Sequence, residues 1–140
     1  MKIKEYRYWN LFLNENQSYL GRCVLMLERE GANFLVDTTQ EERDELFQIL
    51  GEWQEALTEL WHPDWWNYAQ LGNVTPQLHF HLVPRYKEPR EFGGEKFVDE
   101  KWGHDYAPAP KREVDRTLNR AIAGEIKTKL LSNILPQTNR

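Results

Sequence analysis

Two histidines separated by one residue, His79 and His81, are the side chains in this sequence best suited to chemistry. They lie in the stretch Gln77-Leu78-His79-Phe80-His81-Leu82-Val83-Pro84-Arg85, where polar and apolar residues alternate as in a half-buried strand. Successive side chains of a strand point to opposite faces, so Gln77, His79 and His81 should share one face, with the imidazoles about 6.5–7 Å apart. At that spacing both rings can touch one tetrahedral phosphate. A neutral imidazole is a competent nucleophile and its neighbour can stabilise charge, which suits nucleotidyl transfer.

The same pattern has two other interpretations. A His-x-His strand can be a half-exposed polar face without a chemical role, and the pattern also occurs in metal sites. A metal site needs further ligands, and the remaining histidines, His62 and His104, share no motif with the pair. A cupin-like site would have a glutamate soon after the second histidine, whereas Glu88 lies too far along the chain.

Composition indicates one globular domain without a general affinity for polyanions. The chain has 140 residues, 40% hydrophobic and 29% charged, which suits a single folded core. A net charge of −4 leaves no excess of Lys and Arg, so we expect neither nucleic acid nor membrane as a partner, and any phosphate must be held locally. No apolar run is long enough to span a bilayer. The single Cys23 and the absence of a signal-peptide pattern favour the cytoplasm.

Four strands are expected in the first two thirds of the chain. Residues 6–13 and 21–27 are rich in aliphatic and aromatic residues and should pair as a hairpin across a polar loop at 14–18. Residues 65–70 and 77–86 give two more strands, joined by a polar turn. The histidines lie on the last of these strands.

A long helix is expected between the two pairs of strands. Thr38 and Thr39 precede Gln40-Glu41-Glu42, so a threonine three residues before a glutamate predicts a capping box at the start of this helix, and Pro63 ends it. Apolar residues at steps of three and four give this helix one buried stripe, formed by Leu46, Ile49, Leu50, Trp53, Leu57, Leu60 and Trp61.

The last third of the chain should hold an irregular segment and a second helix. Residues 87–110 have no period, and we expect an ordered excursion anchored by its large aromatic residues, Phe92, Phe97, Trp102 and Tyr106. An amphipathic helix is expected over 114–134, with a stripe formed by Val114, Leu118, Ala121, Ile122, Ile126, Leu130 and Ile134. We expect a domain at 1–110, and at 111–140 a helix that packs on that domain or on a dimer partner and frays from Pro136.

The stretch from 67 to 85 closely resembles the signature of the histidine triad (HIT) nucleotide hydrolases and transferases, which alternates three histidines with apolar residues. The order of elements is also similar, so the resemblance covers residues 6–106. It implies an α+β HIT-like fold: an antiparallel β-sheet with a central long helix and a C-terminal helix. It also implies that His79 is the nucleophile that becomes nucleotidylated, while His81 bonds the α-phosphate or the departing oxygen. Similar proteins often form homodimers, and the covalent step requires no metal or cofactor.

This sequence departs from the HIT pattern at two positions. Gln77 stands at the first triad position, where an amide can hydrogen-bond but cannot titrate. Arg22 stands on the strand at 21–27, where many members carry a histidine, and a guanidinium there can clamp a phosphate.

Other candidate binding residues follow from the resemblance. Asn14 falls where members grip the ribose hydroxyls, and Asn73 falls in the loop that contacts phosphate, although both also suit ordinary turns. Asn67 lies beside the site, and Arg85 follows the motif, where it contacts leaving phosphates or solvent. Trp9 can stack on a base, but aromatic residues at strand spacing more often belong to the core.

The resemblance predicts an enzyme that hydrolyses or transfers a nucleoside monophosphate. Its substrate would be a purine nucleotide conjugate such as a dinucleoside polyphosphate or a nucleoside phosphoramidate. An alternative from another class is a nucleotide-binding module that lost turnover when two histidine positions became Gln77 and Arg22. A His-x-His metal-binding protein is the third reading.

Overall fold

The computed structural model describes residues 1–134, so the frayed end expected from Pro136 lies outside the described residues. Seven strands, two α-helices and one 3₁₀ turn occur in these residues. The strands are β1 (Lys2–Glu5), β2 (Trp9–Leu13), β3 (Cys23–Leu27), β4 (Trp65–Ala69), β5 (His79–Arg85), β6 (Arg90–Phe92) and β7 (Glu95–Phe97). The helical elements are η1 (Leu35–Asp37), α1 (Gln40–Trp61) and α2 (Arg116–Ile134).

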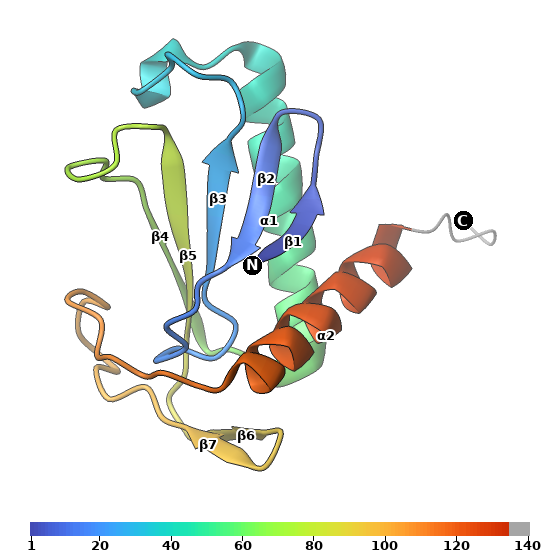
Figure 1. Cartoon of the computed structure of the whole chain (residues 1–140), viewed down its shortest axis with the longest axis vertical. Coiled ribbons are helices and arrows are strands. Elements are labelled where there is room, and N and C mark those ends of the chain that lie inside the picture. Colours follow the sequence, from blue (N-terminus) through green and yellow to red (C-terminus); the bar gives the residue numbers. More distant parts are fainter. Residues whose placement is uncertain (135–140) are drawn as a thin grey trace.

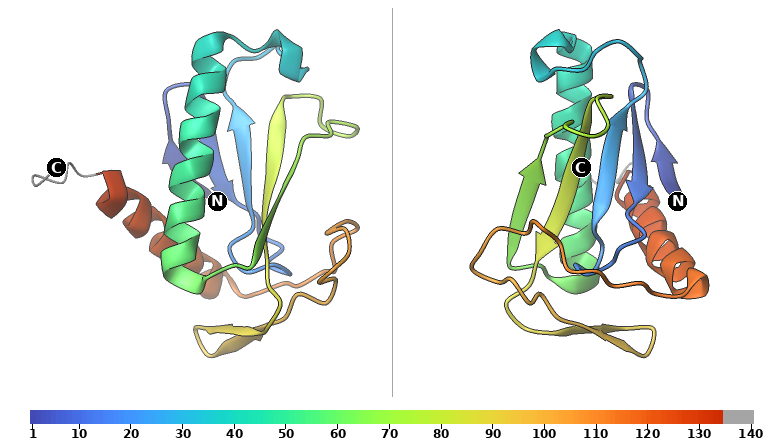
Figure 2. Two further views of the ribbon diagram at one scale, coloured as in Figure 1. Left: turned by 180° about the vertical axis from the view of Figure 1, so that it is seen from behind. Right: turned by 60° about the vertical axis from the view of Figure 1, so that its left-hand side comes forward.

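The first five strands form one antiparallel sheet of order β1-β2-β3-β5-β4. Helix α1 runs along one face of this sheet, and no described helix covers the opposite face of β3, β5 and β4 (Figure 1; Figure 2). The prediction of an α+β fold with an antiparallel sheet, a long helix and a C-terminal helix is confirmed. The predicted hairpin of the strands at 6–13 and 21–27 is present as β2 and β3.

Helix α1 begins and ends where its sequence signals predict. The Thr39 hydroxyl accepts from the Glu42 backbone N–H at 3.1 Å, and the Glu42 carboxylate accepts from the Thr39 N–H at 2.8 Å. These two bonds satisfy backbone donors that the first helical turn leaves free. His62 adopts a left-handed conformation after the helix, and Pro63 follows. The buried stripe packs against alternate residues of β2 and β3 to form the core, including Leu46, Ile49, Trp53, Leu57 and Trp61.

Three differences from the sequence expectations have physical causes. The first strand was expected as one segment from residue 6, but β1 precedes it and buries a single aliphatic side chain, Ile3, so it carries little apolar signal. Hairpin β6–β7 was missed because its signal is only Gly93-Gly94, whose positive φ angles of 59° and 80° suit a two-residue turn. Helix α2 begins later than 114 because Asp115 accepts from the Leu118 N–H at 2.8 Å and caps it.

Helix α2 packs on α1 and on β1. Its buried side chains Ile122, Ile126 and Leu130 belong to the same hydrophobic core as the sheet, whereas Ala121 of the expected stripe is exposed. A contact between this helix and a second copy of the chain stays a prediction. None of the described helices is long and apolar enough to cross a membrane.

A buried ion pair ties the segment after β5 to the sheet. Arg85 Nε lies 2.7 Å from Asp99 Oδ2, and Arg85 Nη2 lies 3.1 Å from Asp99 Oδ1. The Arg85 side chain is 4% exposed and the Asp99 side chain is fully buried. Of the expected aromatic anchors, Phe97 is buried and Phe92 and Tyr106 are half-buried, but Trp102 is 37% exposed and anchors less than expected.

Removal of the Asp99 carboxylate should strongly destabilise the fold. We expect Asp99→Ala to lower the free energy of unfolding by about 3–5 kcal/mol, because it leaves Arg85 charged and buried without its partner. Glu95→Ala is the matched control, since Glu95 is exposed and pairs with Arg112 at 3.4 Å; it should cost less than about 1 kcal/mol. Urea denaturation measures both. Equal losses in the two variants would show that the buried pair does not anchor the segment.

Candidate active site

The two histidines lie on the face of the sheet that α1 does not cover. On β5 they alternate with buried apolar residues that point to the helix side. His79 pairs across the sheet with Met26 of β3, and His81 pairs with Val24 of β3 and Ala69 of β4. The predicted alternation of His79 and His81 onto a single face is therefore confirmed.

One hydrogen bond determines which nitrogen of His79 carries a proton. Nδ1 lies 2.8 Å from the backbone carbonyl oxygen of Gln77. A carbonyl oxygen only accepts hydrogen bonds, so we assign the proton to Nδ1, which leaves the lone pair of the neutral ring on Nε2. The His79 ring lies 5.2 Å from the His81 ring, centroid to centroid, with the planes at 80°. His79 can therefore act as a nucleophile through Nε2 with His81 beside it.

The side chain of Gln77 holds β3 instead of extending the strand of the histidines. Its Nε2 donates to the backbone carbonyl of Leu27 at 2.7 Å. The expectation that this strand begins at residue 77 is wrong, because β5 begins at His79. The backbone carbonyl of Gln77 accepts from His79, so the amide contact also restrains the group that orients the nucleophile. A contact between Gln77 and phosphate stays a prediction.

A buried arginine and a tyrosine ring lie near His81. Arg22, just before β3, is 8% exposed, and its guanidinium carbon lies 5.6 Å from the centre of the Tyr106 ring. The same tyrosine ring lies 6.3 Å from the ring of His81. Among residues 1–134, neither Arg22 Nε nor His81 Nδ1 has a hydrogen-bond partner, although both atoms are buried. An anion that accepts from the guanidinium would satisfy a buried charge that is otherwise incompletely paired.

The pKa of His81 is lowered by its surroundings. Burial is the largest cause, and the charges of Arg22 and His79 act in the same direction. A lowered pKa keeps His81 neutral at neutral pH, because both burial and nearby positive charge disfavour the imidazolium. His81 can then offer an N–H to a phosphate oxygen without adding a full charge to the free site.

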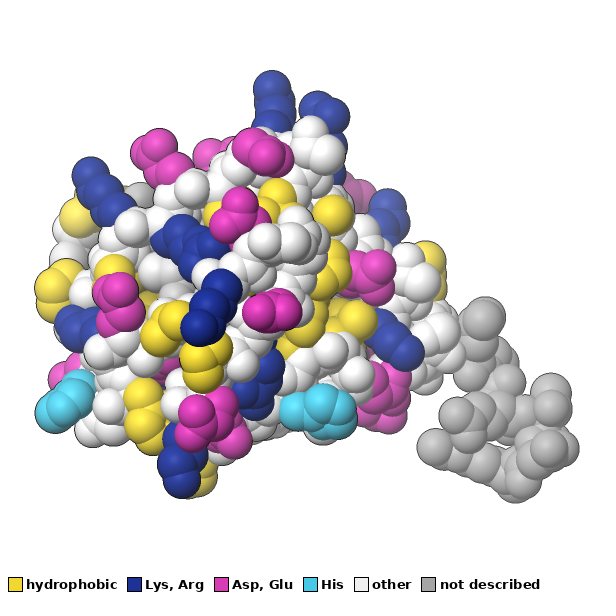
Figure 3. Space-filling model, turned by 90° about the horizontal axis from the view of Figure 1, so that it is seen from below, with side chains coloured by type: hydrophobic (Ala, Val, Ile, Leu, Met, Phe, Trp, Pro, Cys, Tyr) yellow, Lys and Arg dark blue, Asp and Glu magenta, His cyan; other side chains and the backbone are white. Residues whose placement is uncertain are grey.

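The underside of the molecule has no large region of one charge. Seen from below, Lys and Arg side chains are interspersed with Asp and Glu side chains (Figure 3). This face therefore provides no long-range positive field that would attract a phosphate.

Tyr106 and Tyr19 complete this cluster around Arg22 and His81, and neither was predicted from the sequence to lie there. The Tyr19 hydroxyl donates to the backbone carbonyl of Tyr106 at 2.7 Å, which places the Tyr106 ring over Arg22 and near His81. Tyr106 was expected only as an anchor. No spacing rule could have paired it with Arg22, because the two residues are far apart in the sequence.

Arg85 and Asn67 lie together, farther along the sheet than the histidines. The five N–H donors of Arg85 bind the Asp99 carboxylate twice, the Asn67 side-chain oxygen, and the backbone carbonyls of Lys101 and His104. A phosphate contact from Arg85 would require one of these bonds to break. The structure therefore gives Arg85 a positioning role, and Asn67 is held by it.

Asn14 and Asn73 lie in loops at different places. The Asn14 backbone N–H donates to the Arg22 carbonyl at 3.0 Å, so the two candidate binding residues are neighbours. The Asn14 side chain accepts from the Asn16 N–H at 2.9 Å, as in an ordinary Asx turn. Asn73 is exposed in the loop between β4 and β5. Contacts of either residue with a nucleotide stay predictions.

Trp9 belongs to the core. Its side chain is fully buried, and its indole N–H donates to the backbone carbonyl of Glu42 in α1 at 2.8 Å. The possibility that Trp9 stacks on a base is therefore wrong, because the ring faces the helix.

The two histidines considered as further metal ligands, His62 and His104, belong to other parts of the fold than β5. His62 is the C-terminal cap of α1, and His104 lies in the segment after β7. Within residues 1–134, no group of three or more His, Cys, Asp or Glu side chains is arranged to hold a metal ion.

Solved structures with the same fold come from several bacteria. A histidine triad protein from Marinobacter aquaeolei VT8 is 21% identical with a TM-score of 0.78, over 94% of this chain and 89% of that one. A histidine triad (HIT) protein from Sinorhizobium meliloti 1021 is 16% identical with a TM-score of 0.77, over 92% and 88%. A histidine triad protein from Bradyrhizobium japonicum is 21% identical with a TM-score of 0.72, over 93% and 90%.

A family model described as the HIT domain matches residues 5–88, which include both histidines, the whole of β2, β3, β4 and β5, and only the last residue of β1. No curated protein matches the sequence significantly. The family consists in general of nucleotide-binding hydrolases and transferases. Because the match spans more than half of the sequence, the chain belongs to the HIT family.

Proposed function

We propose that this protein hydrolyses or transfers nucleotides by attack of His79 on an α-phosphorus, with a covalent nucleotidyl-histidine as intermediate. The observation that carries the proposal is the 2.8 Å contact between His79 Nδ1 and the Gln77 carbonyl oxygen. It directs the lone pair of His79 to Nε2, and a nucleophile held in one tautomer and orientation needs little reorganisation to react.

The reaction has two displacement steps at phosphorus. In the first, the Nε2 lone pair forms a P–N bond while the bond from phosphorus to the leaving oxygen or nitrogen breaks. The leaving atom keeps the electron pair and takes a proton from solvent, while the neutral His81 donates a hydrogen bond without losing its proton. In the second, water or another acceptor attacks the phosphorus and loses its proton to solvent, the P–N bond breaks, and its electron pair returns to Nε2. These steps require no cofactor.

Arg22 and His81 are the groups placed to stabilise the charge on the phosphoryl oxygens. Arg22 is a buried cation whose Nε has no hydrogen-bond partner among residues 1–134. The Tyr106 ring lies near both Arg22 and His81, and the His81 ring lies beside the His79 ring. Donors fixed in place before the reaction are commonly worth a few kcal/mol each in the transition state. Asn14, the backbone neighbour of Arg22, would hold the ribose of a purine nucleotide.

The substrates proposed are dinucleoside polyphosphates, nucleoside phosphoramidates or related purine nucleotide conjugates. A homodimer is also proposed, because β4 is an edge strand of the sheet and leaves one side of its backbone for pairing with a second copy. The exposed side chain of Tyr68 lies on this edge strand.

Replacement of His79 should remove turnover. We expect His79→Ala to lower kcat by about 10⁴-fold or more, because the nucleophile itself is lost. Gln77→Ala should cost about tenfold, since it loosens the carbonyl that orients His79 but keeps the imidazole. The measurement is steady-state release of nucleoside monophosphate from a panel of adenine dinucleotides and adenosine phosphoramidates.

A histidine outside the site is the control for this series. The control is His62→Asn, because asparagine, like histidine, tolerates the left-handed conformation at the end of α1. This variant should retain full activity. The proposal fails if His79→Ala stays active. Tight binding of the panel by the wild-type protein, with no product from any compound, would instead support the non-catalytic module.

The charge of Arg22 should be visible in the titration of His81. We expect Arg22→Gln to raise the pKa of His81 toward its ordinary value, because removal of a neighbouring positive charge favours the imidazolium. The rise should be partial, since burial, the larger cause, remains. NMR titration of the His81 ring measures the shift, and Arg7→Gln, an exposed arginine on the Tyr8 ring, should leave it unchanged. A pKa that falls or stays constant in Arg22→Gln would refute this electrostatic coupling.

A further inference from the structure

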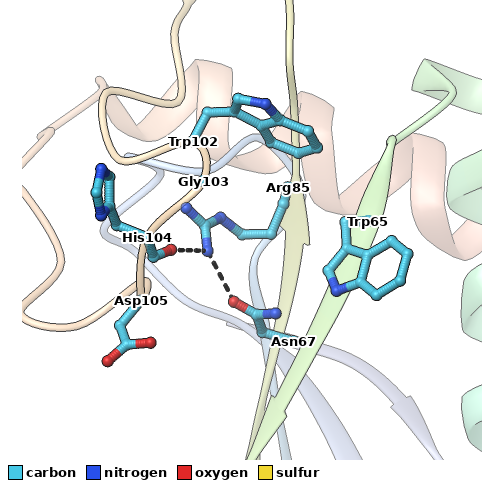
Figure 4. A pocket seen from close by; sticks show the side chains of 7 residues that line it. All are labelled: Trp65, Asn67, Arg85, Trp102, Gly103, His104 and Asp105. Atoms are coloured by element: carbon cyan, nitrogen blue, oxygen red, sulfur yellow. Dashed lines mark hydrogen bonds between the residues drawn. The ribbon is translucent and has the colours of Figure 1, made fainter.

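A cavity of about 440 Å³ lies on the open side of the sheet, beyond the histidines. Its walls come from the ends of β4 and β5 and from the segment after β7 (Figure 4). We call it the tryptophan groove, and define it by Trp65, Asn67, Arg85, Trp102, His104 and Asp105. Trp65 and Trp102 lie on two sides of Arg85 in the close view, and Asp105 lies across from Trp65 (Figure 4).

The groove continues the surface that carries His81. Strand pairing places Ala69 opposite His81, Asn67 opposite Val83 and Trp65 opposite Arg85, all on the same face. At about 3.3 Å per residue, Trp65 and Arg85 lie roughly 13 Å along the strands from His81. A second cavity of about 490 Å³ shares Asn67 and Asp105 with the groove and adds Ala69 and Tyr106, which lie beside His81. A ligand attached at the histidines can therefore extend into the groove.

Two of the six tryptophans are left exposed here. Trp9, Trp53 and Trp61 are buried, and Trp66 packs on Trp53 in the core. Trp65 is 65% exposed and Trp102 is 37% exposed, and both line the groove. Indole rings are large, rigid surfaces on which planar aromatic groups stack, so a pair at one cavity favours an aromatic ligand.

The groove is rigid and offers little to a phosphate. All five N–H donors of Arg85 are engaged, including those that hold Asn67 and the His104 carbonyl, so its floor is preorganised but has no free guanidinium donor. The Asp105 carboxylate at the rim would repel a phosphate. Phosphates should stay near Arg22, and an uncharged end of the substrate should enter the groove.

From these observations we propose that the tryptophan groove is a subsite for a planar aromatic group at the far end of the leaving group. The aromatic group stacks on Trp65 and Trp102 while the α-phosphorus lies at His79. The subsite selects among leaving groups and is separate from the part of the site that holds the nucleoside transferred to His79. This assignment rests on the proposed function, since it takes the histidines as the point of cleavage.

Two probes of equal charge test the subsite. Diadenosine tetraphosphate carries a second adenine, whereas the terminal methyl ester of adenosine tetraphosphate lacks it and keeps the same phosphate chain. We expect wild-type kcat/KM to be about tenfold higher for the diadenosine compound, as one base stacked on aromatic side chains would give. In the Trp65→Ala/Trp102→Ala double variant this preference should disappear, while kcat/KM for the methyl ester is unchanged.

Phe47→Ala is the matched control, because Phe47 is 72% exposed on α1, which covers the other face of the sheet. It should keep the tenfold preference. No preference in the wild-type protein, or a preference retained in the double variant, would overturn the subsite. An equal loss on both probes, with circular dichroism unchanged, would also overturn it, because the tryptophans would then act on the histidine site and not on the leaving group.

Failure of the proposed function can be distinguished from failure of the subsite, because it is seen as a loss of cleavage rather than a loss of preference. If neither probe is cleaved and the panel of adenine dinucleotides and adenosine phosphoramidates also gives no product, the proposed function fails, and calorimetric binding of the same two probes then decides the subsite. Tighter binding of the diadenosine compound that is lost in the double variant supports the groove without catalysis. Equal binding of both compounds by the wild-type protein overturns it.

Discussion

The buried pair of Arg85 and Asp99 connects the two parts of the molecule on which the site depends. Arg85 ends β5, the strand of the histidines, and Asp99 lies in the segment that follows β7. The same guanidinium binds the backbone at Lys101 and His104, so it sets the path of the chain just before Tyr106. Tyr106 then lies over Arg22 and near His81. One charged side chain that makes no hydrogen bond with His79 thus sets which side chains lie around His81.

Around the histidines, backbone and burial act on two chemically identical rings in different ways. Nδ1 of His79 lies against a carbonyl, which leaves the lone pair of the neutral ring on Nε2. Within the described part of the chain, His81 Nδ1 is buried without a hydrogen-bond partner, and burial and the charge of Arg22 lower the pKa of His81. In the proposed mechanism, environment rather than residue type therefore separates the nucleophile from its phosphate-binding partner. Gln77 would contribute to that mechanism through its carbonyl, which orients His79, and through its amide contact with β3.

The parts of the fold that follow from local patterns could be predicted from the sequence. Thr39 and Glu42 cap α1 as expected, and His79 and His81 alternate onto one face because the strand period is two. The strand β1 was not predicted because only Ile3 carries its apolar signal. The roles of Arg85 and Tyr106 were not predictable either, because both depend on contacts between distant segments. From the sequence alone, Arg85 is expected to contact solvent or a leaving phosphate, because its partner Asp99 is brought to it only by the fold.

The covalent step is the central claim, and the stereochemical course at phosphorus tests it most directly. A substrate made chiral at the α-phosphorus with sulfur and oxygen isotopes reports whether that centre is displaced once or twice. Two displacements, the first by His79 Nε2 and the second by water, each invert the centre, so the account predicts net retention of configuration. Net inversion would show direct attack by water and would contradict a nucleotidyl-histidine intermediate.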